Sequence, residues 1–167
     1  MAESITISQL VKGLYTDLQA WCKGKGIELR VARDAWHSYY LLSNAQDGFL
    51  CVLQWSGDDE FGGVIQCPVA RNAFEVVLAR FVGADPEPGL SAFEDATGPG
   101  SLLGLLDQLR ARLLSYAPAQ QTTLGRIRYK HTKPVVSPDG FPYSAYRITV
   151  ELDAGVSRSN VNFVQPQ

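Results

Sequence analysis

One histidine of this 167-residue chain stands among side chains that could perform nucleophilic chemistry. His37 lies in the run Asp34-Ala35-Trp36-His37-Ser38-Tyr39-Tyr40, which supplies a carboxylate and several hydroxyl groups within four residues. Hydrolases activate a hydroxyl nucleophile with a histidine that a carboxylate orients. The chain has no Gly-x-Ser-x-Gly turn, however, and neighbouring side chains point to opposite faces of the strand that we expect here. We interpret His37 as a packed polar residue, and keep a hydrolase using His37 with Asp34 or Asp59 as a third functional hypothesis.

Three consecutive carboxylates, Asp58, Asp59 and Glu60, could attract a hard cation such as calcium or magnesium. Those ions take six or more oxygen ligands from a shaped loop, and the run lacks the spacing of an EF-hand. We interpret it as a solvated acidic turn and predict no metal site.

The three cysteines, Cys22, Cys51 and Cys67, are far apart and form no Cys-x-x-Cys pair. This spacing favours neither a disulfide framework nor a zinc site, so we expect buried thiols. The glycines match neither a P-loop nor a dinucleotide fingerprint. We therefore predict no cofactor and no catalytic residue, and we do not expect an enzyme.

The best local electrostatic feature is a row of basic residues in the C-terminal third. Arg126, Arg128 and Lys130 alternate with apolar residues, which places them on one face of a strand, and Arg147 of the next strand can join them. Three interpretations of this row are open. The side chains are solvated, or they pair with Glu151 and with carboxylates of another subunit, or they contact phosphates. The net charge of -2 supplies no overall positive field, which weighs against a dedicated nucleic-acid binder.

These residues must be positioned by one domain, because 167 residues suit a single core and 46% of them are apolar. We expect a single domain over residues 1–155, with a long loop over 83–100 that is a candidate for contacting a partner. The tail over 156–167 either frays or lies as an extra strand on a neighbouring subunit. The chain has no secretory signal and no apolar run of about 18 residues, so we expect a soluble protein made in the cytoplasm.

Two helices and a set of strands follow from periodicity. Thr6 and Gln9 have the spacing of a capping box at the start of one helix, and Ser101 is a plausible cap for a second. Alternating residues predict strands near 28–32, 37–43, 49–56, 63–67 and 73–81, and a closing hairpin that turns through 137–140. The sequence thus predicts an α+β domain, a mainly antiparallel sheet with two covering helices, in the order helix, meander, helix, hairpin.

In this order of elements, in length and in the style of its closing segment, the chain resembles the small tail-terminator and neck proteins of long-tailed bacteriophages. The closing segment runs from Ile127-Arg-Tyr-Lys through Asp139-Gly140 to Tyr146-Arg-Ile-Thr-Val, and the resemblance covers most of residues 5–153. It implies a structural virion protein, typically a hexameric ring that caps the tail tube and joins it to the capsid.

A heterologous ring needs two different complementary faces on each subunit. On this reading, the basic row faces a neighbour or the passing DNA, and the loop with Asp85 and Glu87 reaches tail-tube or connector proteins. The alternative is a cytosolic, non-enzymatic module of the same build that binds a protein or a small ligand on the concave sheet face.

Overall fold

The two predicted helices begin at hydrogen-bonded caps. At α1 (Ile7–Gly24), Thr6 Oγ1 accepts from the Gln9 N–H at 3.2 Å, and Gln9 Oε1 accepts from the Thr6 N–H at 2.9 Å. At α4 (Leu102–Ser115), Ser101 Oγ accepts from the Gly104 N–H at 3.0 Å. Each cap satisfies an N–H group that has no partner within its helix, so the predicted starts are confirmed.

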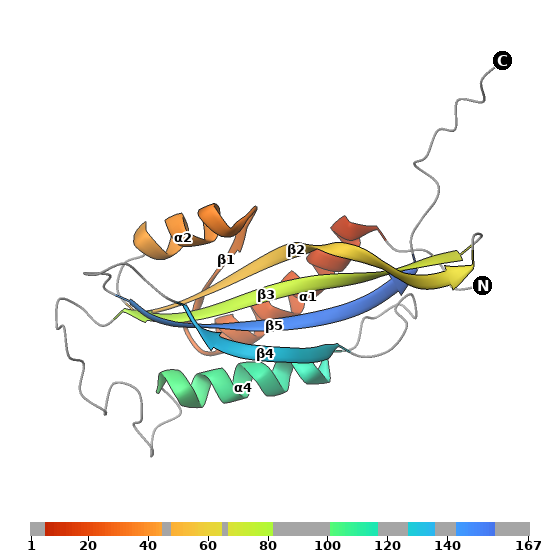
Figure 1. Cartoon of the computed structure of the whole chain (residues 1–167). Helices are drawn as coiled ribbons and strands as arrows, with labels where there is room; N and C mark the ends of the chain where they lie inside the picture. Colours follow the sequence, from red (N-terminus) through yellow and green to blue (C-terminus); the bar gives the residue numbers. More distant parts are fainter. Residues whose placement is uncertain are drawn as a thin grey trace.

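The computed structural model describes residues 6–44, 48–64, 67–81, 101–116, 127–135 and 143–155 (Figure 1). Its sheet contains β1 (Glu28–Ala32), β2 (Phe49–Val64), β3 (Cys67–Phe81), β4 (Arg128–Pro134) and β5 (Tyr143–Gly155). The strands lie in the order β1-β2-β3-β5-β4, and only β1 and β2 run parallel. The α+β class and the mainly antiparallel sheet are therefore confirmed.

The segment predicted as a strand over 37–43 is wrong: it belongs to a helix, α2 (Ala35–Asn44). Asp34 Oδ1 accepts from the His37 N–H at 2.7 Å and caps this helix, while Ser38 and Leu42, four residues apart, are both buried. A parallel pair such as β1 and β2 also requires a crossover connection, which α2 supplies. The aromatic residues of the segment favour strands in general, but this tertiary arrangement outweighs that preference.

The acidic turn predicted at Asp58, Asp59 and Glu60 is also wrong, because β2 continues through it to Val64. The pairing of β2 with β3 slips between Trp55 and Gly57 and again between Glu60 and Gly62, and Gly57 has a φ of 110°. A glycine with positive φ at a β-bulge absorbs an extra residue without ending the strand. The acidic run thus lies in a strand, with Asp58 and Asp59 exposed and the Glu60 side chain outside the described set.

The hairpin prediction is confirmed by β4 and β5, which pair antiparallel, with Pro134 at the end of the edge strand. Its turn at 137–140, the loop over 83–100 and the tail over 156–167 lie outside the described residues. The predicted strand over 63–67 is divided between the end of β2 and the start of β3.

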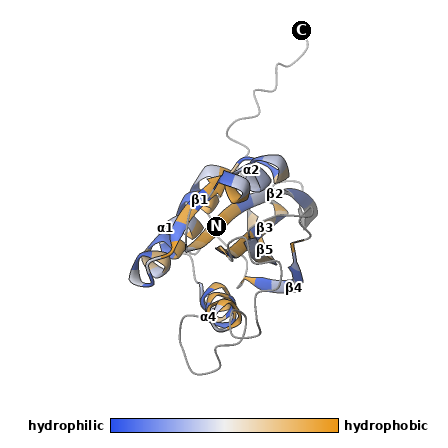
Figure 2. Ribbon diagram, turned by 90° about the vertical axis from the view of Figure 1, so that its left-hand side faces the viewer, coloured by the Kyte–Doolittle hydropathy of each residue, from blue (hydrophilic) through white to orange (hydrophobic). Residues whose placement is uncertain are grey.

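The main core lies between the sheet and the pair α1 and α4, which cover one face (Figure 2). The helices contribute Leu10, Leu14, Leu18, Cys22, Leu102, Leu105, Leu106, Leu109 and Leu113, and the strands contribute Phe74, Val76, Leu78, Ile148 and Val150 among others. The opposite face has a smaller cluster, in which α2 packs Leu42 against Leu50, Val52, Val77 and Ala79. β3 is thus buried on both faces from Val76 to Ala79, where both clusters meet it.

Two of the three cysteines confirm the expectation of buried thiols. Cys22 at the end of α1 and Cys51 on β2 are both fully buried in the main core. The neighbouring Cys22 thiol and the burial in the apolar core raise the pKa of the Cys51 thiol well above its ordinary value. The side chain of Cys67 lies outside the described set.

We expect Cys22 and Cys51 to resist alkylation in the folded protein, because the thiolate is the reactive form and both sulfurs are shielded from solvent. Iodoacetamide at pH 8, followed by peptide mass spectrometry, should leave both residues unmodified and should modify both in denaturant. Modification of either at the rate of an exposed thiol would contradict their burial.

Candidate assembly surface

One half of the sheet face opposite α1 and α4 carries charged side chains in place of an apolar cluster. We call this half the charged sheet face. It consists of Arg71 and Glu75 on β3, Arg128 and Lys130 on β4, and Arg147, Glu151 and Asp153 on β5. On β5 these residues alternate with Ile148, Val150 and Leu152 of the main core, so the period of the strand separates the two faces.

Asp153 joins the three strands of this surface. It lies opposite Arg71 in the pairing of β3 with β5, and its Oδ1 accepts from Arg71 Nε at 3.2 Å. Arg128 Nη2, from β4 on the other side, donates to both oxygens of Asp153 at 2.8 and 2.9 Å. One carboxylate of the middle strand therefore holds a guanidinium from each neighbouring strand, in hydrogen bonds that charge strengthens.

Glu151 is the second acidic centre of the charged sheet face. Its carboxylate lies 3.2 Å from Lys130 Nζ, 3.7 Å from Arg71 Nε and 3.9 Å from Arg128 Nη2. Farther along β5, Arg147 Nε lies 3.4 Å from a carboxylate oxygen of Glu75. The ion pairs thus run both across and diagonally between strands, at the distances over which cross-strand neighbours interact.

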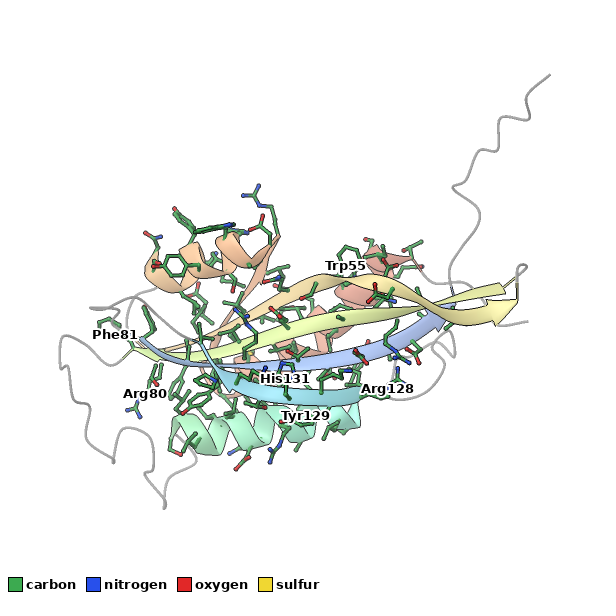
Figure 3. The ribbon with its side chains drawn as sticks, viewed as in Figure 1. Trp55, Arg80, Phe81, Arg128, Tyr129 and His131 are labelled. Atoms are coloured by element: carbon green, nitrogen blue, oxygen red, sulfur yellow. The ribbon has the colours of Figure 1, made fainter. Side chains whose placement is uncertain are left out.

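A bulge in β4 alters the expected alternation of the basic row. Tyr129 pairs with Val150 and His131 with Thr149, so Lys130 is an extra residue between them. Val150 and Thr149 point to opposite faces, and for this reason Tyr129 and His131 do not share a face. Tyr129 contacts α4, where the Arg110 guanidinium lies 6.0 Å from its ring centre (Figure 3).

Burial separates the acids of this surface from its bases. The side chains of Asp153 and Glu151 are 9% and 15% exposed, whereas those of Arg128 and Lys130 are 46% and 48% exposed. The carboxylates form the floor, and the cations lie over them at the rim. Since the three carboxylates offset most of the charge of the four cations, this arrangement favours a contact with protein over one with phosphates, whose affinity depends on uncompensated positive charge.

Four of the seven residues predicted for an interface meet on this surface: Arg128, Lys130, Arg147 and Glu151. The other three, Arg126, Asp85 and Glu87, lie outside the described residues. Sequence reasoning missed Arg71, Glu75 and Asp153. Asp153 follows Glu151 at the strand period, which was a usable signal, whereas the position of Arg71 depends on a strand pairing that no local pattern reveals.

Two of the residues considered for nucleophilic chemistry, Asp34 and His37, form hydrogen bonds with the backbone at the start of α2, whereas Asp59 lies on β2. The Asp34 carboxylate accepts from the His37 N–H, and His37 Nδ1 accepts from the Arg33 N–H at 3.1 Å. Neither hydrogen bond joins the imidazole to a carboxylate or to a hydroxyl. The geometry thus places Asp34 and His37 in a helix cap, which is a structural role.

Among the described residues, no group of three His, Cys, Asp or Glu side chains could hold a metal ion. No helix in that part of the chain has the length and apolar character needed to cross a membrane. Comparison of the chain with models of known protein families and with curated protein sequences finds no match.

Proposed function

We propose that the protein is a non-enzymatic structural subunit that assembles with copies of itself into a ring. The observation that carries the proposal is the charged sheet face, a sheet surface that no described helix covers and that presents basic side chains over buried carboxylates. Following the resemblance in element order, we propose a hexameric tail terminator or neck subunit of a phage virion. Its other partners would be tail-tube and connector proteins.

The physical case for assembly depends on what such a surface can do at a subunit contact. Charged groups across an interface contribute more to specificity than to affinity. They fix the orientation of the two partners and repel proteins whose charges do not match. The rim side chains of Arg128 and Lys130 are half exposed, so a neighbour can reach them without disturbing the floor. Because the carboxylates of the charged sheet face offset most of its positive charge, DNA passing through the ring would meet little attraction from this surface.

Light scattering coupled to size exclusion tests the proposal. We expect the wild type to form a ring and the double variant Arg128→Gln, Lys130→Gln to elute as a monomer with an unchanged circular dichroism spectrum. Glutamine is preferred to glutamate, because a new carboxylate beside Glu151 and Asp153 would destabilise the fold itself.

The matched control is Lys12→Gln, Lys23→Gln, which removes the same charge from two exposed positions of α1 and should retain the wild-type mass. Unchanged mass in the Arg128, Lys130 variant would exclude the charged sheet face from the contact. A wild type that stays monomeric at high concentration and low salt would contradict the ring and favour a binding module.

A further inference from the structure

The sheet has two edges, and they differ in whether a further strand can be added. β4 forms one edge, and it carries a bulge at Lys130, a proline at its end and exposed basic side chains. Proteins use these features to block the addition of a strand. β1 forms the other edge and pairs with β2 over all of its 5 residues, without a bulge or a proline. No strand in the described part of the chain pairs with the outer side of β1, which lies between α1 and α2 (Figure 2).

β1 presents an apolar side and a charged side along this edge. Leu29 packs partly against the main core, and Val31, on the same side of the strand, is 41% exposed. Glu28 and Arg30 lie exposed on the other side, where Arg30 Nε donates to Glu28 Oε1 at 2.6 Å. A strand added here would therefore match β1 best with apolar side chains on one side and neutral polar side chains on the other.

The tail over 156–167 has this pattern in its sequence. Val161 and Phe163 alternate with Asn160 and Asn162. In an extended chain, this alternation presents two apolar side chains on one side and two amides on the other. The one charged residue of the tail, Arg158, has the same sign as the exposed basic side chains of β4. The tail thus matches the edge at β1 better than the edge at β4.

We propose that the tail of one copy adds as a strand to the outer edge of β1 of the next copy. The apolar residues of the tail would pack on the apolar side of β1, as aromatic and β-branched residues do across neighbouring strands. The two asparagines would lie on the charged side, where an amide can donate to Glu28 and accept from Arg30. Main-chain hydrogen bonds along β1 would supply the affinity.

This inference rests on the proposed assembly, and the charged sheet face links the two. Asp153 of that face lies two residues before Gly155, the end of β5, after which the tail begins. A neighbouring copy that contacts Arg128 and Lys130 would therefore lie beside the start of the tail. The charged sheet face and tail of one copy would meet β1 of the other, and such a contact between two different surfaces is the kind that a ring requires.

The tail is too short to reach β1 of its own chain. Arg30 on β1 is in register with Arg147 on β5, through the pairings of β1 with β2, β2 with β3 and β3 with β5. From Gly155 to a position just outside Arg30, roughly 26 Å along the strands combine with about 19 Å across them, which gives a distance of about 33 Å. The chain from Gly155 to Asn162 spans at most about 25 Å when fully extended. The pairing therefore requires a second copy.

Light scattering on tail variants tests the contribution of the tail to the assembly. We expect Val161→Ser, Phe163→Ser to lose the ring at a concentration at which the wild type is assembled, with an unchanged circular dichroism spectrum. The matched control is Asn160→Ser, Asn162→Ser, which changes two residues on the other side of the same segment. Because serine is also neutral and polar, this control should retain the ring.

A peptide-binding assay isolates the tail from the rest of the contact. A fluorescein-labelled peptide of residues 156–167 is added to the full-length Val161→Ser, Phe163→Ser variant, which keeps an intact β1. We expect the peptide to bind, with a rise in fluorescence anisotropy, and to lose this binding when Val31→Lys is also introduced, because a lysine on an edge strand opposes the addition of another strand. Leu114→Lys, at a side chain that is 40% exposed on α4, is the matched control and should leave the binding unchanged.

Three results would overturn the inference. A full ring from the Val161→Ser, Phe163→Ser variant would exclude the tail from the contact while leaving the proposed assembly intact. A peptide that does not bind, or that binds equally well after Val31→Lys, would exclude β1 as the receiving edge. A monomeric wild type would overturn the inference together with the proposed function.

Discussion

Replacing Leu109 with alanine should lower the free energy of unfolding by about 3–4 kcal/mol, near the middle of the range measured for buried leucines. Leu109 is fully buried in the middle of α4, among the leucines that this helix packs on the sheet. The substitution removes apolar area from the core, and it also leaves a cavity that a rigid sheet and two helices can fill only partly. The loss would be a substantial part of the stability of one domain.

Leu114 on the same helix gives the matched control, because the substitution is identical and only burial differs. Its side chain is partly exposed, and Leu114→Ala should change the free energy of unfolding by less than about 1 kcal/mol. Equilibrium unfolding in urea, followed by circular dichroism, measures both variants. Equal losses would contradict the packing of α4 on the sheet through Leu109.

The elements that sequence reasoning predicted well are those whose signals are local. α1 and α4 follow from the caps at Thr6 and Ser101 and from leucines at helical spacing, and each cap is made by side chains within three residues. β5 follows from the alternation between Tyr146 and Leu152, because in this stretch one face of the strand meets the main core and the other carries partly exposed polar and charged side chains. In these segments local preference and tertiary environment agree.

α2 shows where local signals fail. Its aromatic residues are frequent in strands, and its exposed side carries the large side chains that a core-facing pattern would place inside. What makes it a helix is partly non-local: β1 and β2 are parallel, and a parallel pair needs a connection that crosses the sheet. Because β1 and β2 are parallel, they do not form the simple meander that the sequence predicts for this region.

Some residues of the charged sheet face could likewise be predicted from local patterns, and others could not. The basic residues of β4 were visible as an alternating row, and Glu151 was visible on the following strand. Their partners depend on register: Arg71 meets Asp153 because β3 and β5 pair with those two residues opposite each other, 82 positions apart in the chain. The bulge that brings Lys130 to Glu151 is likewise a property of strand pairing.

Asp153→Ala should lower the free energy of unfolding by about 2–4 kcal/mol, near the cost of breaking a buried ion pair. The carboxylate is almost fully buried, and it holds Arg71 and Arg128 from the two strands that flank β5. Its removal leaves the guanidinium groups of Arg71 and Arg128 without the carboxylate that both of them bind. The contacts that join β3 and β4 to β5 at this point are then lost. Asp153→Asn, which keeps the shape and one acceptor oxygen, should lose less.

Asp107→Ala is the control that separates burial from ion pairing as such. Asp107 also pairs with an arginine, Arg110, at 2.9 Å, but its side chain is largely exposed, and such surface pairs contribute at most about 1 kcal/mol. Urea denaturation at low and high salt should show a small, salt-sensitive effect for Asp107 and a large, less sensitive one for Asp153. Equal effects would mean that Asp153 does not join the strands.

Unfolding measurements also distinguish the role of the buried carboxylates of the charged sheet face from the role of its exposed cations. Asp153 lies beneath the cations, so its loss should appear as a lower stability of each subunit. Arg128 and Lys130 are half exposed, and replacing them with glutamine should change the mass of the assembly far more than the unfolding transition. If both substitutions changed stability alone, the surface would serve only to hold three strands together, and the contact between copies would have to lie elsewhere.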